Sequence, residues 1–299
     1  MNEELVGLSY GLLFWIGLGA LALIVSWIGG ALHERRMRRR QRDRLTSDVS
    51  RLRGRMTRMA QPTLLLTPAS SPGHSKLGGQ PDLPAGFEWP HVRGRPSQFL
   101  AQLDLGAFRD HVALEWLPGQ GRLFFFVDPD GHGFSDQVQV FHCGGTGSTS
   151  EAPADVGSFP ERRIAFEQYL SRASLDWMGV DLSEIDVTDD ELDQLSALPD
   201  EPFGDEIQHR IGGYPSEIQG GQMAVECELI RRGLPGDGAT EISPAIQRAS
   251  KSWRLLLQID SDPALKMNWG DGGRLYVFVR EQDAKAGDFS RTITLSQTD

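Results

Sequence analysis

The sequence predicts a strand-rich α+β fold, an internally duplicated soluble domain preceded by a single transmembrane helix. Three observations predict this class: an uncharged apolar stretch near the N-terminus, a series of short apolar runs between Gly and Pro clusters, and three short blocks that occur twice in the same order. A chain of 299 residues, 39% of them hydrophobic, is long enough to bury a substantial core. The composition therefore excludes a disulfide miniprotein, a fibrous repeat and a wholly disordered chain.

The uncharged stretch, residues 5–32, follows a short tail (residues 1–4) and is expected to form the transmembrane helix. About 20 helical residues suffice to cross the hydrocarbon core. The alternative is a secretory signal peptide, but the stretch is preceded by Glu3 and Glu4 instead of a basic region. Since basic residues stay on the cytoplasmic side, the 11 arginines of residues 33–60 predict an N-terminus outside and a C-terminal domain in the cytoplasm, at a bacterial inner (plasma) membrane.

Residues 33–60 form an Arg-rich juxtamembrane segment with two interpretations. Apolar residues alternate at spacings of four and three, which is typical of a short coiled coil and hence of a homodimer: Leu45, Val49, Leu52, Met56 and Met59. The alternative is a basic helix held to anionic lipid headgroups through Arg35–Arg58. Nucleic acid is not an expected partner, because residues 61–299 hold 36 Asp and Glu against 19 Lys and Arg.

Residues 61–74 are assigned as a linker, with a strand at LLLTPASSPGHS as the alternative, and residues 75–299 as the main domain. Seven short apolar runs predict strands, beginning at residues 99, 121, 137, 223, 253, 273 and 291. Three segments predict helices, residues 161–173, 186–198 and 243–250; the second carries a capping box, with Thr188 three residues before Glu191.

Comparison of the domain with itself reveals three paired blocks. SKLGGQPDLP at 75 matches HRIGGYPSEI at 209, FLAQLDL at 99 matches LLLQIDS at 255, and GRLFFFV at 121 matches GRLYVFV at 273. The sequence therefore predicts one compact domain with pseudo-repeats at about 75–145 and 207–295, joined by an acidic connector at 150–206.

These blocks also carry a family resemblance. SKLGGQPDLPAGFEWP, LPGQGRLFFFVD, HRIGGYPSEIQ, WRLLLQIDSD and MNWGDGGRLYVFV follow one another within residues 75–290. In this order they resemble the bacterial YwqG-like family, a family of unknown function. The resemblance implies a mixed, internally duplicated fold, and it carries over no activity and no catalytic residue.

The paired Gly-Gly-x-Pro turns are the first candidate ligand site. Backbone N–H groups of such turns can bind an anion, and a basic residue precedes each turn. The candidates are Lys76, Gly78, Gly79, Arg210, Gly212 and Gly213. The alternative is a tight turn alone, since the strand–loop–helix context of a phosphate loop is absent.

Two glutamines within apolar strands are the next candidates. Gln102 and Gln258 are each followed two residues later by an acid, Asp104 and Asp260. Buried amides need hydrogen-bond partners, so the two glutamines are expected to meet across the interface of the repeats. A structural network is favoured over catalysis, because an amide is not a general acid or base at neutral pH.

Asp271, beside an expected exposed Trp269, is a further candidate for lining a groove, and its Asp-Gly-Gly sequence also fits a structural turn. DPDGHG at 128 begins like a calcium loop but lacks the remaining oxygen ligands, and Cys143 and Cys227 have no zinc-type spacing. No metal and no cofactor are expected.

The function that these features favour is a membrane-tethered, cytoplasmic binding or interaction module of unknown ligand, and not an enzyme. Asp176–Glu206 contains 12 acidic and no basic residues, which predicts a solvated face or a docking surface for a basic protein. The alternative function is an enzyme that uses Asp104, Asp260 or Asp271 in a groove beside Trp269 and Trp89.

Overall fold

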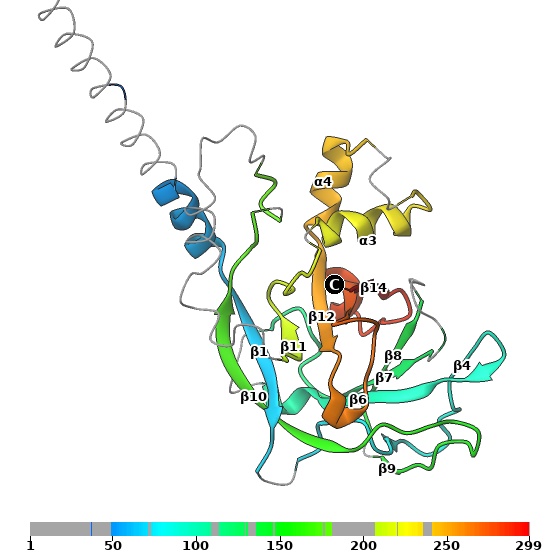
Figure 1. Cartoon of the computed structure of the whole chain (residues 1–299). Helices are drawn as coiled ribbons and strands as arrows, with labels where there is room; N and C mark the ends of the chain where they lie inside the picture. Colours follow the sequence, from blue (N-terminus) through cyan, green and yellow to red (C-terminus); the bar gives the residue numbers. More distant parts are fainter. Residues whose placement is uncertain are drawn as a thin grey trace, which may run out of the picture. The chain divides into compact units, whose positions relative to one another are not determined.

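The computed structural model describes residues 37, 49–70, 73–108, 114–128, 130, 136–145, 147–175, 177–180, 207–219, 221–235 and 241–298. The chain divides into two compact units. In the first unit, residues 1–55 and 182–195, the described residues are helical. The second unit, residues 56–181 and 196–299, contains the strands (Figure 1).

Ten antiparallel strands form the main sheet of the second unit, in the order β14-β13-β12-β11-β1-β10-β2-β6-β7-β8. Their bounds are Gln61–Pro68 (β1), Lys76–Leu77 (β2), Gln98–Asp104 (β6), Arg122–Val127 (β7), Val138–Cys143 (β8), Arg162–Ser171 (β10), Arg210–Gly212 (β11), Trp253–Asp260 (β12), Arg274–Arg280 (β13) and Ile293–Gln297 (β14). Two small pairs join β3 (Asp82–Leu83) to β9 (Ser148–Thr149) and β4 (His91–Val92) to β5 (Arg95–Pro96).

The helices of this unit are short. They are α3 (Met223–Arg231), α4 (Pro244–Ser250) and α5 (Glu281–Lys285), with 3-10 turns η1 (Leu105–Phe108) and η3 (Pro263–Leu265). Ser243 caps α4, because its hydroxyl accepts a hydrogen bond from the N–H of Ile246, and Pro244 occupies the first helical position.

The two ends of the main sheet have the same arrangement of strands. From the centre outward, the first half runs β2-β6-β7-β8 and the second half runs β11-β12-β13-β14. The two central strands are exchanged between the halves: β1 precedes the first half in sequence but pairs with β11, and β10 precedes the second half but pairs with β2. Since β1 and β10 also pair with each other along their length, neither half has a complete sheet of its own (Figure 1).

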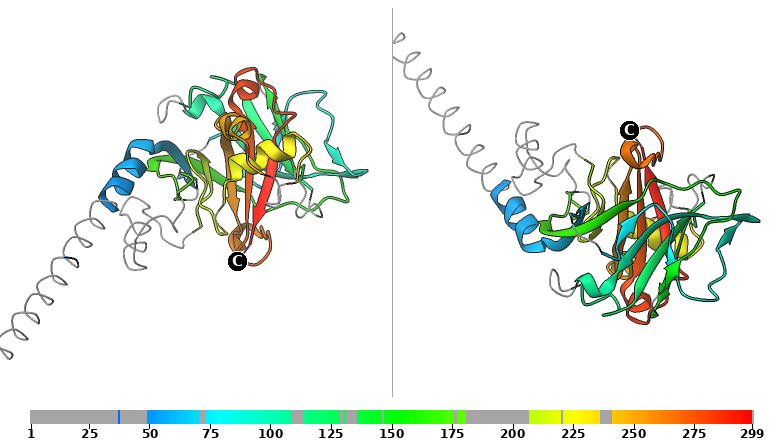
Figure 2. Two further views of the ribbon diagram at one scale, coloured as in Figure 1. Left: turned by 90° about the horizontal axis from the view of Figure 1, so that it is seen from above. Right: turned by 90° about the horizontal axis from the view of Figure 1, so that it is seen from below.

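The two outer strands of the sheet approach each other. The N–H of Val138 on β8 donates to Oγ1 of Thr294 on β14 at 3.1 Å, and the rings of His142 and Phe289 lie 5.9 Å apart beside it. The sheet is therefore a nearly closed, barrel-like one (Figure 2).

The interior of this sheet is the main core. It combines leucines of β1, β6, β7 and β12 with Val277 and Val279 of β13. Two smaller apolar clusters cover the outer faces: α3 packs on β12, β13 and β14, while Leu83 and Phe87 pack on the phenylalanines of β6 and β7. Each fully buried side chain of this kind contributes about 1.5–3 kcal/mol.

Six of the seven predicted strands are confirmed as β6, β7, β8, β12, β13 and β14, and the helix predicted at residues 243–250 is confirmed as α4. Two assignments are wrong. Residues 161–173 are predicted as a helix, but they form β10, because β1 and β2 supply backbone partners on both sides. The run at residue 223 is predicted as a strand, but it forms α3, whose Met223, Ala224 and Cys227 share one buried helical face.

Within the residues that the structure describes, no helix is long and apolar enough to cross a membrane. The expected transmembrane helix, residues 5–32, lies outside those residues, as does the helix expected at residues 186–198. The absence of such a helix from the described residues corrects two predictions, the fold class with its membrane-spanning helix and the single-pass location in a bacterial plasma membrane. The fold is strand-rich, with a nearly closed sheet. Of the Arg-rich segment, residues 49–59 are helical.

Gly213 allows the closest backbone approach at the second Gly-Gly turn, and we expect Gly213→Ala to destabilise the chain by about 3 kcal/mol. Its φ is +65°, and a Cβ there would overlap the hydroxyls of Thr63 on β1 and Ser171 on β10. Gly94 is the matched control, because its φ is +77° and its Cβ would meet nothing within 4 Å. Gly94→Ala should cost only about 1 kcal/mol in urea unfolding, and equal losses for the two variants would contradict this packing.

Candidate functional site

In the first half of the sheet, one buried glutamine holds the Gly-Gly turn against β6. Gln102 lies opposite Lys76 of β2. Its Oε1 accepts a hydrogen bond from the N–H of Asp82 at 2.8 Å, and its Nε2 donates to the carbonyl of His74 at 2.6 Å. A single amide therefore joins the strand to both ends of the turn, and we call this arrangement the Gln102 clamp.

The second half repeats the arrangement. Gln258 lies opposite Arg210 of β11; its Oε1 accepts from the N–H of Ser216 at 2.9 Å and its Nε2 donates to the carbonyl of Gln208 at 3.3 Å. This is the Gln258 clamp. Each glutamine is thus bonded within its own half, so the expectation that Gln102 and Gln258 meet across the repeats is wrong.

The N–H groups of the first turn are used within the chain. Gly78 donates to the carbonyl of Leu100 and Gly79 to that of Phe159, both at 2.8 Å. Both glycines have positive φ, 62° and 73°, as tight turns require. These two N–H groups are therefore not available to an anion.

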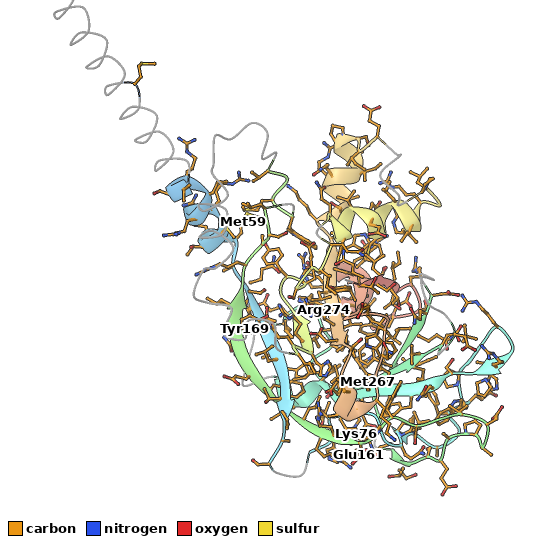
Figure 3. All side chains as sticks on the ribbon, viewed as in Figure 1. Met59, Lys76, Glu161, Tyr169, Met267 and Arg274 are labelled. Atoms are coloured by element: carbon orange, nitrogen blue, oxygen red, sulfur yellow. The ribbon has the colours of Figure 1, made fainter. Side chains whose placement is uncertain are left out.

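The basic residues before the turns are buried and engaged. Lys76 is 1% exposed and its Nζ lies 3.4 Å from Asp82 Oδ1 and 3.3 Å from Glu161 Oε2 (Figure 3). Arg210 is fully buried, donates through Nη2 to the side chain of Gln208 and lies 5.6 Å above the ring of Tyr169, while its Nε and Nη1 have no hydrogen-bond partner among the described residues. Both side chains therefore belong to the clamps.

A second pair of equivalent residues differs between the halves. Arg274 begins β13 opposite Asp260, and Arg122 begins β7 opposite Asp104. Arg274 Nη1 donates to the carbonyl and to the hydroxyl of Ser216, both at 2.9 Å, and its Nε lies 3.3 Å from Asp260 Oδ2. The second half thus matches the guanidinium of Arg274 with a carboxylate and two neutral oxygens.

Arg122 has no such match. It is only 8% exposed, and its Nη1 is buried without a hydrogen-bond partner among the residues described. The two acids at the equivalent positions are engaged elsewhere: Asp82 Oδ2 accepts from Gln102 Nε2 at 2.7 Å, and Asp104 Oδ1 accepts from the N–H of Gly106 at 3.0 Å. A buried cation without a counter-charge is costly, so this position calls for an explanation.

Arg122 lies in the wall of a cavity of about 720 Å³ beside the Gln102 clamp. The other polar side chains of the wall are Ser70, His74, Asp82, Ser148, Thr149 and Arg163. Arg163 pairs with Glu161, 2.8 Å between Nε and Oε1. Among the described residues of this wall, the arginine without a counter-charge is therefore Arg122.

The carboxyl of Asp82 in the same wall is held ionised. Burial would raise its pKa, but hydrogen bonds from Gln102 and Thr149 and the positive charge of Lys76 outweigh burial and lower the pKa below its usual value. Asp82 is thus a fixed anion paired with Lys76 and not a group that releases a proton near neutral pH.

Comparison with known families assigns the domain that carries these clamps. Residues 75–297 match the model of the family described as a domain of unknown function, DUF1963. The chain belongs to this family. No curated protein matches the chain.

Several predicted site residues of the DUF1963 domain are not brought together. Trp269 is 5% exposed and packs against Phe159 in the main core, so the expectation of an exposed tryptophan is wrong. Trp89 packs on Phe126 at the outer face of the first half, and Asp271 lies on an exposed turn. The expected groove beside Trp269 and Trp89 is therefore not formed by these residues.

Asp260, by contrast, lies at the centre of the Gln258 clamp, where its Oδ1 accepts from Gln258 Nε2 at 2.8 Å and its Oδ2 from the N–H of Gln208 at 2.9 Å. Gly212 and Gly213 form the turn of that clamp, with φ of 73° and 65°.

Burial raises the pKa of the thiols of Cys143 and Cys227, which makes both less reactive.

Within the described part of the chain, no group of three or more His, Cys, Asp or Glu could hold a metal ion. Of the DPDGHG segment, Asp128 and Asp130 are described, and both lie within ion-pairing distance of arginines, Arg93 and Arg95. The acidic stretch Asp176–Glu206 lies outside the described residues, except for residues 177–180.

A second cavity of about 370 Å³ lies beside α3 and α4 of the DUF1963 domain. Its wall contains Trp177, Tyr214 and Trp253 together with Arg254, which pairs with Glu281 at 2.7 Å. Because this arginine has a counter-charge, the larger cavity is the stronger candidate site.

Sequence reasoning misses Arg122, Asp82 and the other residues of the larger cavity. The signal was present in part, because the paired blocks align Arg122 with Arg274 and Asp82 with Ser216. That alignment identifies equivalent positions, but it does not reveal which arginine finds partners within the chain. The difference becomes visible only from the distances.

We expect Arg274→Gln to lower the free energy of unfolding by about 1–3 kcal/mol, because it removes charge-assisted hydrogen bonds and leaves Asp260 without that cation. Arg122→Gln is the matched variant at the equivalent position. It should leave stability unchanged or raise it, since it removes a buried charge that has no partner within the described residues. Urea unfolding of the full chain measures both, and an equal loss in the two variants would contradict the difference between the halves.

Acid should weaken the Gln102 clamp through Asp82. Since the folded-state pKa of Asp82 is lowered, its contribution is present above the usual pKa of about 3.9 and is lost as pH falls through the folded value. Asp82→Asn should therefore be less stable than the natural chain at pH 7, and the difference should shrink below about pH 4. A difference that stays constant down to pH 3 would show that Asp82 does not act as a carboxylate.

Proposed function

We propose that the DUF1963 domain of this chain is a binding module for a small polar ligand that occupies the cavity beside the Gln102 clamp. The observation that carries the proposal is the convergence of polar side chains on this cavity, among them the buried and unmatched Arg122. Ligand sites in proteins are concave and place a few polar groups on a rigid wall. Here the wall is rigid because Gln102 fixes the turn that carries Asp82.

The alternative function, an enzyme that uses carboxylates, has less support. The pKa of Asp82 is lowered, whereas a general acid at neutral pH needs a raised one. Of the carboxylates considered for that role, Asp260 is 4% exposed and committed to the Gln258 clamp, and Asp271 lies on an exposed turn. These features favour binding over acid–base catalysis.

The finer family assignment is also a proposal. The YwqG-like resemblance is consistent with the DUF1963 match, because its sequence blocks at residues 75–290 fall within residues 75–297. The basic protein partner expected at Asp176–Glu206 stays a prediction of the sequence.

Ser148→Trp tests the proposed function by filling the cavity. Ser148 is exposed in the cavity wall, so the change should block the ligand without disturbing the core. Native mass spectrometry of the full chain, purified gently from its own cells, should show a small-mass adduct on the natural chain that Ser148→Trp loses.

Ser296→Trp is the matched control, because Ser296 is an exposed strand residue on β14 outside this cavity wall. It should keep the adduct. An adduct that survives Ser148→Trp, or a natural chain that never carries one, would contradict ligand binding at this cavity.

A further inference from the structure

We infer that the ligand of the cavity beside the Gln102 clamp carries an oxyanion, a carboxylate or a phosphate, that binds the guanidinium of Arg122. The inference rests on the proposed function and adds the chemical class of the ligand. Its basis is the second half of the same sheet, where the equivalent arginine has its partners within the chain.

The second half shows which groups satisfy an arginine at this position. Arg274 meets a carboxylate oxygen of Asp260 at 3.3 Å and two neutral oxygens of Ser216 at 2.9 Å. Asp260 is in turn held by Gln258 Nε2 at 2.8 Å. One anionic group with neighbouring oxygens is therefore the complement of the guanidinium in this setting.

The first half has the same order of strands but directs its acids elsewhere. Gln102 Nε2 donates to Asp82 on the turn, whereas Gln258 Nε2 donates to Asp260 on the strand. Lys76 adds a second bond to Asp82, and Thr149 a third at 3.1 Å. With Asp82 committed to these three donors, Arg122 receives no carboxylate from the described residues around it.

The position of Arg122 suits it to bind a ligand. Its backbone is fixed, because β7 lies between β6 and β8, and Gly121 before it has a φ of 96°. The side chain is more than nine-tenths buried, its Nη1 has no hydrogen-bond acceptor among the described residues, and the residue lines the cavity. A ligand that enters this cavity therefore meets a desolvated guanidinium, which binds oxyanions through charge-assisted hydrogen bonds.

The remaining wall suits an oxyanion as well. The hydroxyl of Ser148 adds a donor, and the second guanidinium, Arg163, adds positive charge although it pairs with Glu161. The negative charge of Asp82 faces the same cavity but is matched by Lys76. A neutral ligand would supply acceptors to Arg122 but leave its charge uncompensated, which is the costly case.

The test is isothermal titration calorimetry of the full chain with two probes, sodium phosphate and sodium citrate, at constant ionic strength. At least one probe should bind the natural chain, and Arg122→Gln should weaken that binding at least about tenfold, the effect of one lost charge-assisted contact. Arg122→Lys, which keeps the charge but loses the planar fork, should fall between the two. The probe that binds more tightly distinguishes a phosphate from a carboxylate.

Two controls carry the same change of charge. Arg274→Gln removes the equivalent arginine, and Arg291→Gln removes a guanidinium that is 67% exposed. Both should bind the probe as the natural chain does, and the second should not affect folding. Binding that is equal in the natural chain and in Arg122→Gln, or absent for both probes, would overturn the inference that the ligand carries an oxyanion.

The two proposals fail separately. An adduct that Ser148→Trp removes but Arg122→Gln leaves in place would support ligand binding and overturn the oxyanion. An adduct that neither change removes would overturn both.

Discussion

A buried amide hydrogen bond holds each Gly-Gly turn of this domain against its sheet, and the arrangement of the polar groups follows from it. Gln102 and Gln258 are fully buried, and each satisfies backbone groups on both sides of a turn that has no other regular structure. Without that amide the N–H after the proline and the carbonyl before the turn would lose this partner, and a group that water does not reach would then cost about 1–3 kcal/mol. The clamp thereby fixes the positions of Asp82 and Ser216, and these decide what each arginine meets.

Exchange of β1 and β10 makes the two clamps parts of one structure. Each central strand pairs with a turn strand of the half that it does not precede, so the halves depend on each other for backbone hydrogen bonds. The halves can nevertheless differ in side chains, because the clamps need only the glutamine, the two glycines and the proline. In the second half, Ser216 and Asp260 bind the guanidinium of Arg274. In the first half, Asp82 pairs with Lys76, and Arg122 lines a cavity. A duplicated scaffold in which Arg274 is satisfied within the chain and Arg122 lines a cavity is the physical basis of the proposed binding role.

The strands and the turns could be predicted from the sequence, since β7 and β13 are apolar runs that follow a glycine and both turns carry Gly-Gly-x-Pro. The strand β10 could not, because its residues 161–173 also fit a helix and only the neighbouring strands β1 and β2 decide between the two. The segment of α3 is the reverse case, because it is predicted as a strand and forms a helix. Its eight-residue apolar run fits both the strand period of two and the helical period of about 3.6, so the pattern alone does not distinguish them. The glutamines were recognised as buried, but their partners lie in turns about 20 and 42 residues away, and no spacing rule reveals that Arg122 and Arg274 differ.

The most direct test of this account is a crystal structure of the full chain grown once with sodium citrate and once with sodium phosphate. The account predicts that electron density for one of these anions lies within hydrogen-bond distance of the Arg122 guanidinium, while Arg274 keeps Ser216 and Asp260 and binds neither. Anion density at Arg274, or an Arg122 side chain that turns to Asp104 or Asp82 in both crystals, would contradict the difference between the two halves.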